Sequence, residues 1–250
     1  MRTSNPALSD KAFRVDQPVA GAKVMTINGT VNKTGILLCL LWVAALFTWD
    51  KTMSLVQAGE NPAVLYPWMI GGAIGGFVIA LITVFKKTAA PFTAPLYAIV
   101  EGLFLGVLSA FFEVQFPGIV FQAVLLTFGT LLALLFAYKT GLIKATENFK
   151  LGVAAATGGI FVVYMISMVL GFFGVSIPLI HESGVVGIGF SLFVVVIAAL
   201  NLVLDFDFIE NGAEQGAPKY LEWYAAFGLL VTLIWLYIEL LRLLSKLRSR

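Results

Sequence analysis

The residues of this sequence that could do chemistry are carboxylates placed inside long apolar segments. Glu101 lies at the centre of the run LYAIVEGLFLGVL, with no Lys or Arg within a helical turn. Asp205 and Asp207 end the run ALNLVLDFDF, and Glu239 lies late in LIWLYIELLRLL. A charged group within a membrane span is costly and is a functional hypothesis by default. Buried carboxylates with no nucleophile beside them favour cation or proton handling, and hard oxygen ligands suit Ca²⁺.

Polar neighbours accompany two of these carboxylates. Asn201 precedes Asp205 by one helical turn and lies on the same face, so that it offers the carboxylate a buried hydrogen-bond partner. Thr232 lies two turns before Glu239 on one face of the last apolar segment. Glu101 has no partner in its own helix, so it must pair with another span, face water or be protonated through desolvation.

Purely structural explanations exist for several of these acids. Glu239 is three residues before Arg242, a spacing that favours an ordinary ion pair. Asp207 is followed by Glu210 and Glu214, and the three can lie together in a solvated loop. Both the functional and the structural interpretations stay open from sequence alone.

Several enzyme classes do not fit the residue inventory. A zinc hydrolase needs about three His or Cys ligands, whereas the chain has one histidine, His181, and one cysteine, Cys39. A membrane serine protease needs Ser and His on facing helices, but His181 and Ser183 are loop neighbours. An aspartyl protease lacks a second span with an aspartate, and a retinal protein lacks a lysine before Lys246 in the last helix. We expect no enzymatic activity and no cofactor.

The segments that carry these residues indicate a membrane protein. The 250 residues are 60% hydrophobic and 12% charged, whereas soluble domains are about 25% charged. The net charge of +2 gives no reason to expect nucleic acid as a partner. The sequence predicts an all-α membrane protein of about seven transmembrane helices in apolar runs near 36–49, 66–85, 94–112, 118–138, 149–173, 185–204 and 220–241.

Charge distribution predicts the domain organisation. We expect a polar cytoplasmic N-terminal arm over residues 1–34, a seven-helix transmembrane domain over residues 35–246 and a basic tail over residues 247–250. Lys and Arg are concentrated in the arm and in the second and fourth loops, which predicts a cytoplasmic N-terminus. Seven spans would put the C-terminal tail on the non-cytoplasmic side, whereas its positive charge favours the cytoplasmic side. The side of the C-terminus therefore stays open.

Three segments of the sequence are informative together: MTINGTVNKTGILL, PLYAIVEGLFLGVLSAFFE and LDFDFIENGAEQGAPKYLEWYAAFGLLVTLIWLYIELLRLL. They resemble the bacterial branch of the Bax inhibitor-1 family, the transmembrane Bax inhibitor motif proteins, and the likeness runs from about residue 25 onward. The resemblance implies six helices around a central C-terminal helix and a pH-sensitive Ca²⁺ leak in a bacterial inner membrane. In that family two aspartates, one on the sixth and one on the seventh helix, share a proton and set the open or closed state.

Transferred to this sequence, the resemblance leaves the proton-sharing pair incomplete. Asp205 matches the sixth-helix aspartate, eight residues before the AEQG turn, and is the position where Ca²⁺ would bind. Thr232 stands where the seventh-helix aspartate is expected, and a threonine does not titrate in this range. Glu239, Asp207 and Glu101 are the candidates for a second acid, and Glu101 matches a third-helix carboxylate of many members. Because a single acid lacks the repulsion of a pair, we expect a shallower pH dependence here.

Other functions compete with the leak. One is a non-conducting regulator that binds membrane proteases or other membrane proteins, for which the N-terminal arm would matter and Asp205 would not. Another is a small-molecule transporter, but such proteins usually contain inverted repeats, and the sequence gives no clear sign of one. The partners expected for the leak are the lipid bilayer, Ca²⁺ and H⁺.

Overall fold

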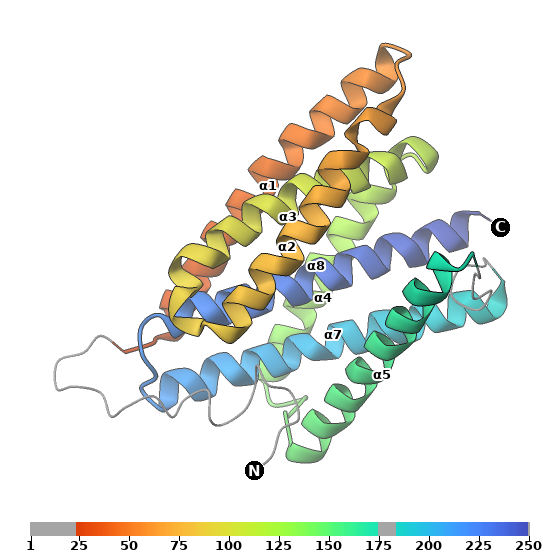
Figure 1. Cartoon of the computed structure of the whole chain (residues 1–250). Helices are drawn as coiled ribbons and strands as arrows, with labels where there is room; N and C mark the ends of the chain where they lie inside the picture. The colour runs from red at the N-terminus through yellow and green to blue at the C-terminus, as the bar shows by residue number, and fades with distance from the viewer. Residues whose placement is uncertain (1–23, 175–183, 250) are drawn as a thin grey trace. The chain divides into compact units, whose positions relative to one another are not determined.

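The protein is built of long α-helices. The computed structural model describes residues 24–174 and 184–249; His181 and Ser183 and most of the N-terminal arm lie outside these ranges. The described chain contains two short 3-10 helices, η2 (Pro62–Leu65) and η3 (Lys87–Ala89), an isolated β-bridge and no strand. Its α-helices (Figure 1) are α1 (Ile27–Gln57), α2 (Tyr66–Phe85), α3 (Ala90–Gln115), α4 (Ile119–Lys139), α5 (Glu147–Phe172), α7 (Val185–Glu214) and α8 (Leu221–Arg248).

Seven helical segments of the described chain are long and apolar enough to cross a membrane. This confirms the all-α class and the number of spans, and it makes the chain an integral multi-pass membrane protein. The last helix, α8, is the most buried of them, with 61% of its apolar window buried against 11–44% for the others.

Helix α1 begins at Ile27 rather than near residue 36, within the segment assigned to the polar arm. Thr26 caps it, because its hydroxyl accepts a hydrogen bond from the backbone N–H of Gly29 at 3.0 Å. The apolar run misses these first turns because they carry asparagine, threonine and lysine side chains. Lys33 is therefore a helical residue.

Helix α7 continues to Glu214, ten residues beyond the apolar run that ended at 204. Asp207, Glu210 and Glu214 are thus helical, and their predicted location in a solvated loop is wrong. Gly212 is the one helix-breaking residue between Asp205 and Gly216. The helix ends just before Gly216, which has a positive φ of 65° and is followed two residues later by Pro218. Polarity alone did not end the helix.

The chain divides into two compact units, each with segments from distant parts of the sequence. The first unit comprises, among described residues, 24–120 and 208–231. The second comprises 121–174, 184–207 and 232–249. Helices α7 and α8 contribute to both units, so each unit receives one part of each of these two helices.

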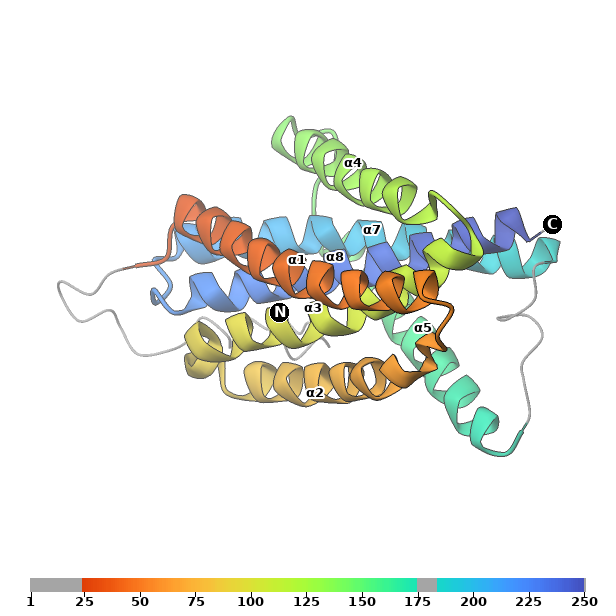
Figure 2. The ribbon, with the colours of Figure 1, turned by 90° about the horizontal axis from the view of Figure 1, so that it is seen from above.

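In the first unit, α3 lies beside both α1 and α2 (Figure 2). Glycine allows the close approach to α1: a Cβ atom on Gly102 would lie 2.4 Å from the carbonyl oxygen of Leu41, and one on Gly106 would lie 2.1 Å from that of Ala45. Thr48 of α1 also donates a hydrogen bond to the carbonyl oxygen of Leu103 at 3.0 Å. Small residues and short hydrogen bonds are typical of helix packing in membranes.

In the second unit, an apolar cluster joins α5, α7 and α8. Its buried centre is formed by Ile160, Val194 and Ile197, and the ring of Trp235 packs against it. The polar groups described next lie on the same three helices.

Candidate functional site

Asp205 and Thr232 meet in the second unit, on α7 and α8. Their side chains are joined by a hydrogen bond, with the Thr232 hydroxyl donating to the carboxylate. Oδ2 of Asp205 is buried and has no hydrogen-bond partner in the described chain. A buried polar atom that lacks a partner costs about 1–3 kcal/mol, and more when it is charged. Asp205 is therefore a carboxylate with one satisfied oxygen and one that is left unmatched.

Asn201 is not the partner of Asp205, and that prediction is wrong. Its side-chain Nδ2 donates two hydrogen bonds, one to Thr157 Oγ1 and one to the carbonyl oxygen of Ile197, each at 2.8 Å. These bonds use both protons of the amide nitrogen, so that no donor remains for the carboxylate. Thr157 of α5 accepts the hydrogen bond of Asn201, and this contact between two helices could not be predicted from the spacing along one helix.

Asp207 forms an ion pair instead of lying free in a loop. Lys150 of α5 approaches its Oδ2 to 2.7 Å, and the same ammonium group lies 3.5 Å from Glu147. The positive charge of Lys150 balances the negative charge of Asp207. Asp207 is therefore a weak candidate for the second acid of a proton-sharing pair.

Glu239 is nearly inaccessible, with 2% of its side chain exposed, and it is fully matched. Arg242 Nη1 donates to its two oxygens at 3.0 and 3.2 Å, which confirms the ion-pair interpretation. Tyr164 of α5 adds hydrogen bonds to the same oxygens at 3.0 and 3.1 Å. Arg242 also donates to the tyrosine hydroxyl at 2.7 Å. Glu239 thus belongs to a closed three-residue network and is not available to Asp205.

These contacts reveal a pattern on α5 that the sequence analysis missed. Lys150, Thr157 and Tyr164 follow one another at intervals of seven residues, which is about 10.5 Å along a helix, and they share one face. Each of the three meets a different polar side chain of the candidate set. The signal was present in the sequence as three polar residues spaced by seven in an apolar run.

The apolar cluster interrupts this line of polar groups. Ile160 lies between Thr157 and Tyr164 along α5, and it packs with Val194 and Ile197 of α7. Nearer the end of α8, Lys246 donates to Ser191 Oγ at 2.8 Å, which continues the polar contacts beyond the cluster.

In the first unit, Glu101 lies on α3 against Gly76 of α2. A Cβ atom on Gly76 would lie 2.1 Å from Glu101 Oε2 and 3.8 Å from a ring carbon of Tyr97. Glycine at position 76 thus provides the space that the carboxylate occupies. Glu101 and Asp205 belong to different units.

Glu222, which the sequence analysis did not single out, is the most completely satisfied acid of the first unit. Its side chain is fully buried and accepts hydrogen bonds from the backbone N–H and the hydroxyl of Thr26, both at 2.9 Å. Lys219 lies 2.7 Å away, and Lys33 forms a second ion pair. Gly29 leaves room for the carboxylate. The spacing of Lys219 and Glu222 was the available signal.

No group of three or more His, Cys, Asp or Glu side chains able to hold a metal ion occurs in the described ranges. Within the described ranges, Asp205 is therefore not part of such a cluster.

Comparison with known families and proteins gives one match. The model of the family described as Bax inhibitor 1 like matches residues 5–249, nearly the whole chain. No match was found among the curated proteins or the solved structures. The match covers all seven spans and the segments on which the resemblance was based, so the chain belongs to the Bax inhibitor 1 like family.

Proposed function

We propose that this protein is a pH-sensitive leak pathway for Ca²⁺, in which Asp205 binds either a proton or the permeating cation. The observation that supports it is the buried Asp205 carboxylate, with Thr232 on one side and no partner for Oδ2 in the described chain. Family membership supports the same function.

The chemistry follows from the unmatched oxygen. An ionised carboxylate with a buried oxygen that accepts no hydrogen bond is poorly stabilised. Either a proton or a cation at Oδ2 relieves that cost, and the two cannot bind to the same oxygen at once. Proton binding therefore competes with Ca²⁺ binding, which makes the flux depend on pH.

The charged neighbours of Asp205 leave it as the group that titrates. On α7, Asp207 is paired with Lys150 of α5. On α8, Glu239 is paired with Arg242 and is two turns beyond Thr232. Because these acids have their own cations, Asp205 is expected to respond as a single site, with a shallower pH dependence than that of a two-aspartate relative.

We further propose that the N-terminus faces the cytoplasm of a bacterial inner membrane. The loops that return to the N-terminal side carry Lys86, Lys144 and Lys219. The loop between α3 and α4, on the opposite side, carries no lysine or arginine. An excess of positive loop residues marks the cytoplasmic side.

Ca²⁺ uptake into vesicles that contain the purified full chain tests the leak. Asp205→Asn keeps the shape of the side chain but removes its ionisable group, so uptake should lose its pH dependence. Glu210→Gln is the matched control, because it neutralises an exposed acid on the same helix, and its profile should follow the wild type. No uptake above that of empty vesicles, with folded protein, would contradict the leak and favour a regulator that binds membrane proteins.

A further inference from the structure

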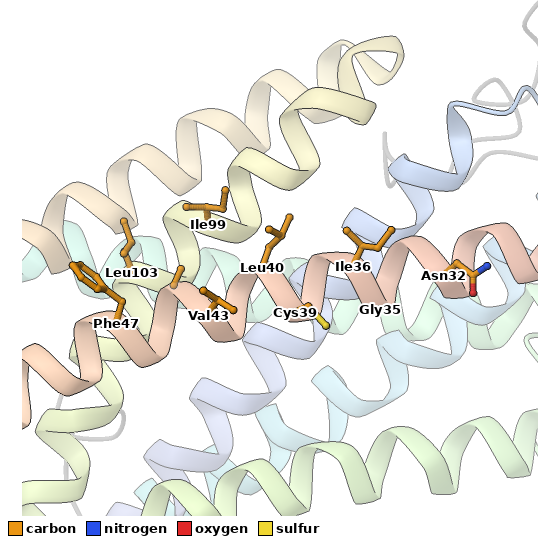
Figure 3. A pocket seen from close by; sticks show the side chains of 10 residues that line it. Asn32, Gly35, Ile36, Cys39, Leu40, Val43, Phe47, Ile99 and Leu103 are labelled. Carbon is orange, nitrogen blue, oxygen red and sulfur yellow. The ribbon is translucent and has the colours of Figure 1, made fainter.

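An open apolar groove of about 760 Å³ runs along α1 and α3 in the first unit (Figure 3). Ten side chains line it, and nine of them are apolar or are glycine or cysteine. The residues on which the argument depends are Gly35, Cys39, Val43 and Phe47 of α1 and Ile99 and Leu103 of α3.

The groove lies beside the line along which the two helices touch, and Ala44 belongs to both. The close contacts of Gly102 and Gly106 are made with Leu41 and Ala45 of α1. Gly35 lies away from that contact, and a Cβ atom added to it would meet nothing within 4 Å. The hollow is thus left unfilled by the side chains of the protein.

The surroundings of the groove define what can fill it. Both helices are membrane spans, and the groove wall includes Val43, with 70% of its surface exposed, and Phe47, with 51% exposed. An empty apolar hollow loses dispersion contacts, and at this depth the neighbouring medium is hydrocarbon rather than water. A flexible acyl chain can follow such a surface.

The length and the one polar end of the groove fit a lipid of a single leaflet. From Asn32 to Phe47 the lining extends over fifteen residues of α1, or roughly 22 Å at 1.5 Å per residue. The hydrocarbon of one leaflet is about 15 Å thick, so an acyl chain whose ester group lies at Asn32 would extend along about the first two thirds of this lining. Asn32 is the polar side chain of the lining, and its amide can donate to the ester carbonyl groups of a glycerolipid.

We propose that the groove binds one acyl chain of a membrane phospholipid, with the ester region of that lipid at Asn32. This site is separate from the Asp205 site and does not rest on the proposed function.

Photocrosslinking to a lipid in vesicles tests the proposal. The full chain is placed in phosphatidylcholine vesicles that contain phosphatidylcholine with a diazirine on its acyl chain, and the adducts are mapped by mass spectrometry. Adducts should be concentrated on the groove residues of α1 and α3 compared with Ile74 and Phe77 of α2, which are 61% and 60% exposed.

Two glycine variants provide a matched pair. Gly35→Leu places a side chain in the groove and should lower the groove adducts severalfold. Gly71→Leu is the control, because Gly71 of α2 also has nothing within 4 Å of an added Cβ atom, and it should leave the groove adducts unchanged. A helical circular dichroism spectrum equal to that of the wild type shows that each variant is folded.

Two results would overturn the proposal. One is an adduct pattern that follows exposure alone on α1 and α2 and is insensitive to Gly35→Leu. The other is occupation by a second copy of the chain, which would be detected as a Cys39–Cys39 disulfide on mild oxidation, since Cys39 is the sole cysteine of the sequence.

Discussion

The two units each bury an acid, and the two acids are treated in opposite ways. Glu222 in the first unit accepts hydrogen bonds from Thr26 and pairs with Lys33 and Lys219. Asp205 in the second unit receives a hydrogen bond from Thr232, and its Oδ2 is left without a partner in the described chain. Burial alone thus does not distinguish the two acids. The difference lies in whether the carboxylate is matched by donors and cations.

The matched acid has a structural consequence. Glu222 joins the start of α1 to the start of α8, because its partners lie at Thr26, Lys33 and Lys219. Under the proposed function, the unmatched acid binds a proton or a cation and has no such anchoring role. We therefore expect substitutions of Glu222 to act on stability and substitutions around Asp205 to act on the pH profile.

Glu222→Leu should have the largest effect on stability. It leaves Lys33 and the Thr26 N–H without their acceptor, and breaking a buried pair costs about 3–5 kcal/mol. Lys219 is 44% exposed and can turn to solvent, so we expect about 3 kcal/mol, the lower end of that range. Thermal unfolding in detergent measures the loss. An unchanged unfolding temperature would show that the network is not a structural anchor.

Arg242→Gln should convert a matched acid into an unmatched one. Glu239 is 2% exposed and would keep Tyr164 as its donor but lose its cation. We expect a loss of stability of about 2 kcal/mol, and a second titrating group in the Ca²⁺ uptake profile. Tyr164→Phe is the companion variant, because it removes the hydroxyl and leaves the cation in place, and it should cost less. A pH profile of Ca²⁺ uptake identical to that of the wild type would show that the loss of its cation does not change how Glu239 behaves.

Thr232→Asp should have a smaller effect on stability and a specific one on pH dependence. It places a second carboxylate where Thr232 now donates to Asp205. Two acids at close range repel each other when both are ionised and titrate as a coupled pair, so the uptake profile should become steeper. Thr232→Val is the control, since it removes the hydroxyl without adding an acid and should leave the profile shallow. An equally steep profile for both variants would rule out the single-acid explanation.

The features of this molecule that depend on composition along one helix could be predicted from the sequence. The seven spans follow from apolar runs, and Glu101 and Asp205 stand out because charge is rare inside such runs. The ends of α1 and α7 were misplaced because a capping threonine and a polar but unbroken stretch do not show in hydropathy.

Hydrogen-bond partners on different helices could not be predicted from the sequence. Asn201 bonds to Thr157 rather than to Asp205, and Tyr164 completes the network of Glu239, because the facing helix decides which donor is available. The seven-residue spacing on α5 was visible in the sequence. Its role in pairing polar side chains can be recognised once the residues opposite each position are known.

Competition between a proton and Ca²⁺ for the Asp205 carboxylate is the central element of the proposed function. Infrared difference spectra of the purified protein, with and without Ca²⁺, measure this directly through the carbonyl stretch of a protonated carboxylic acid. We predict that Ca²⁺ removes a protonated-acid band in the wild type and that the band is missing in Asp205→Asn but present in Glu210→Gln. Absence of any Ca²⁺-sensitive band in the wild type, or the same Ca²⁺-sensitive band in Asp205→Asn, would contradict the competition.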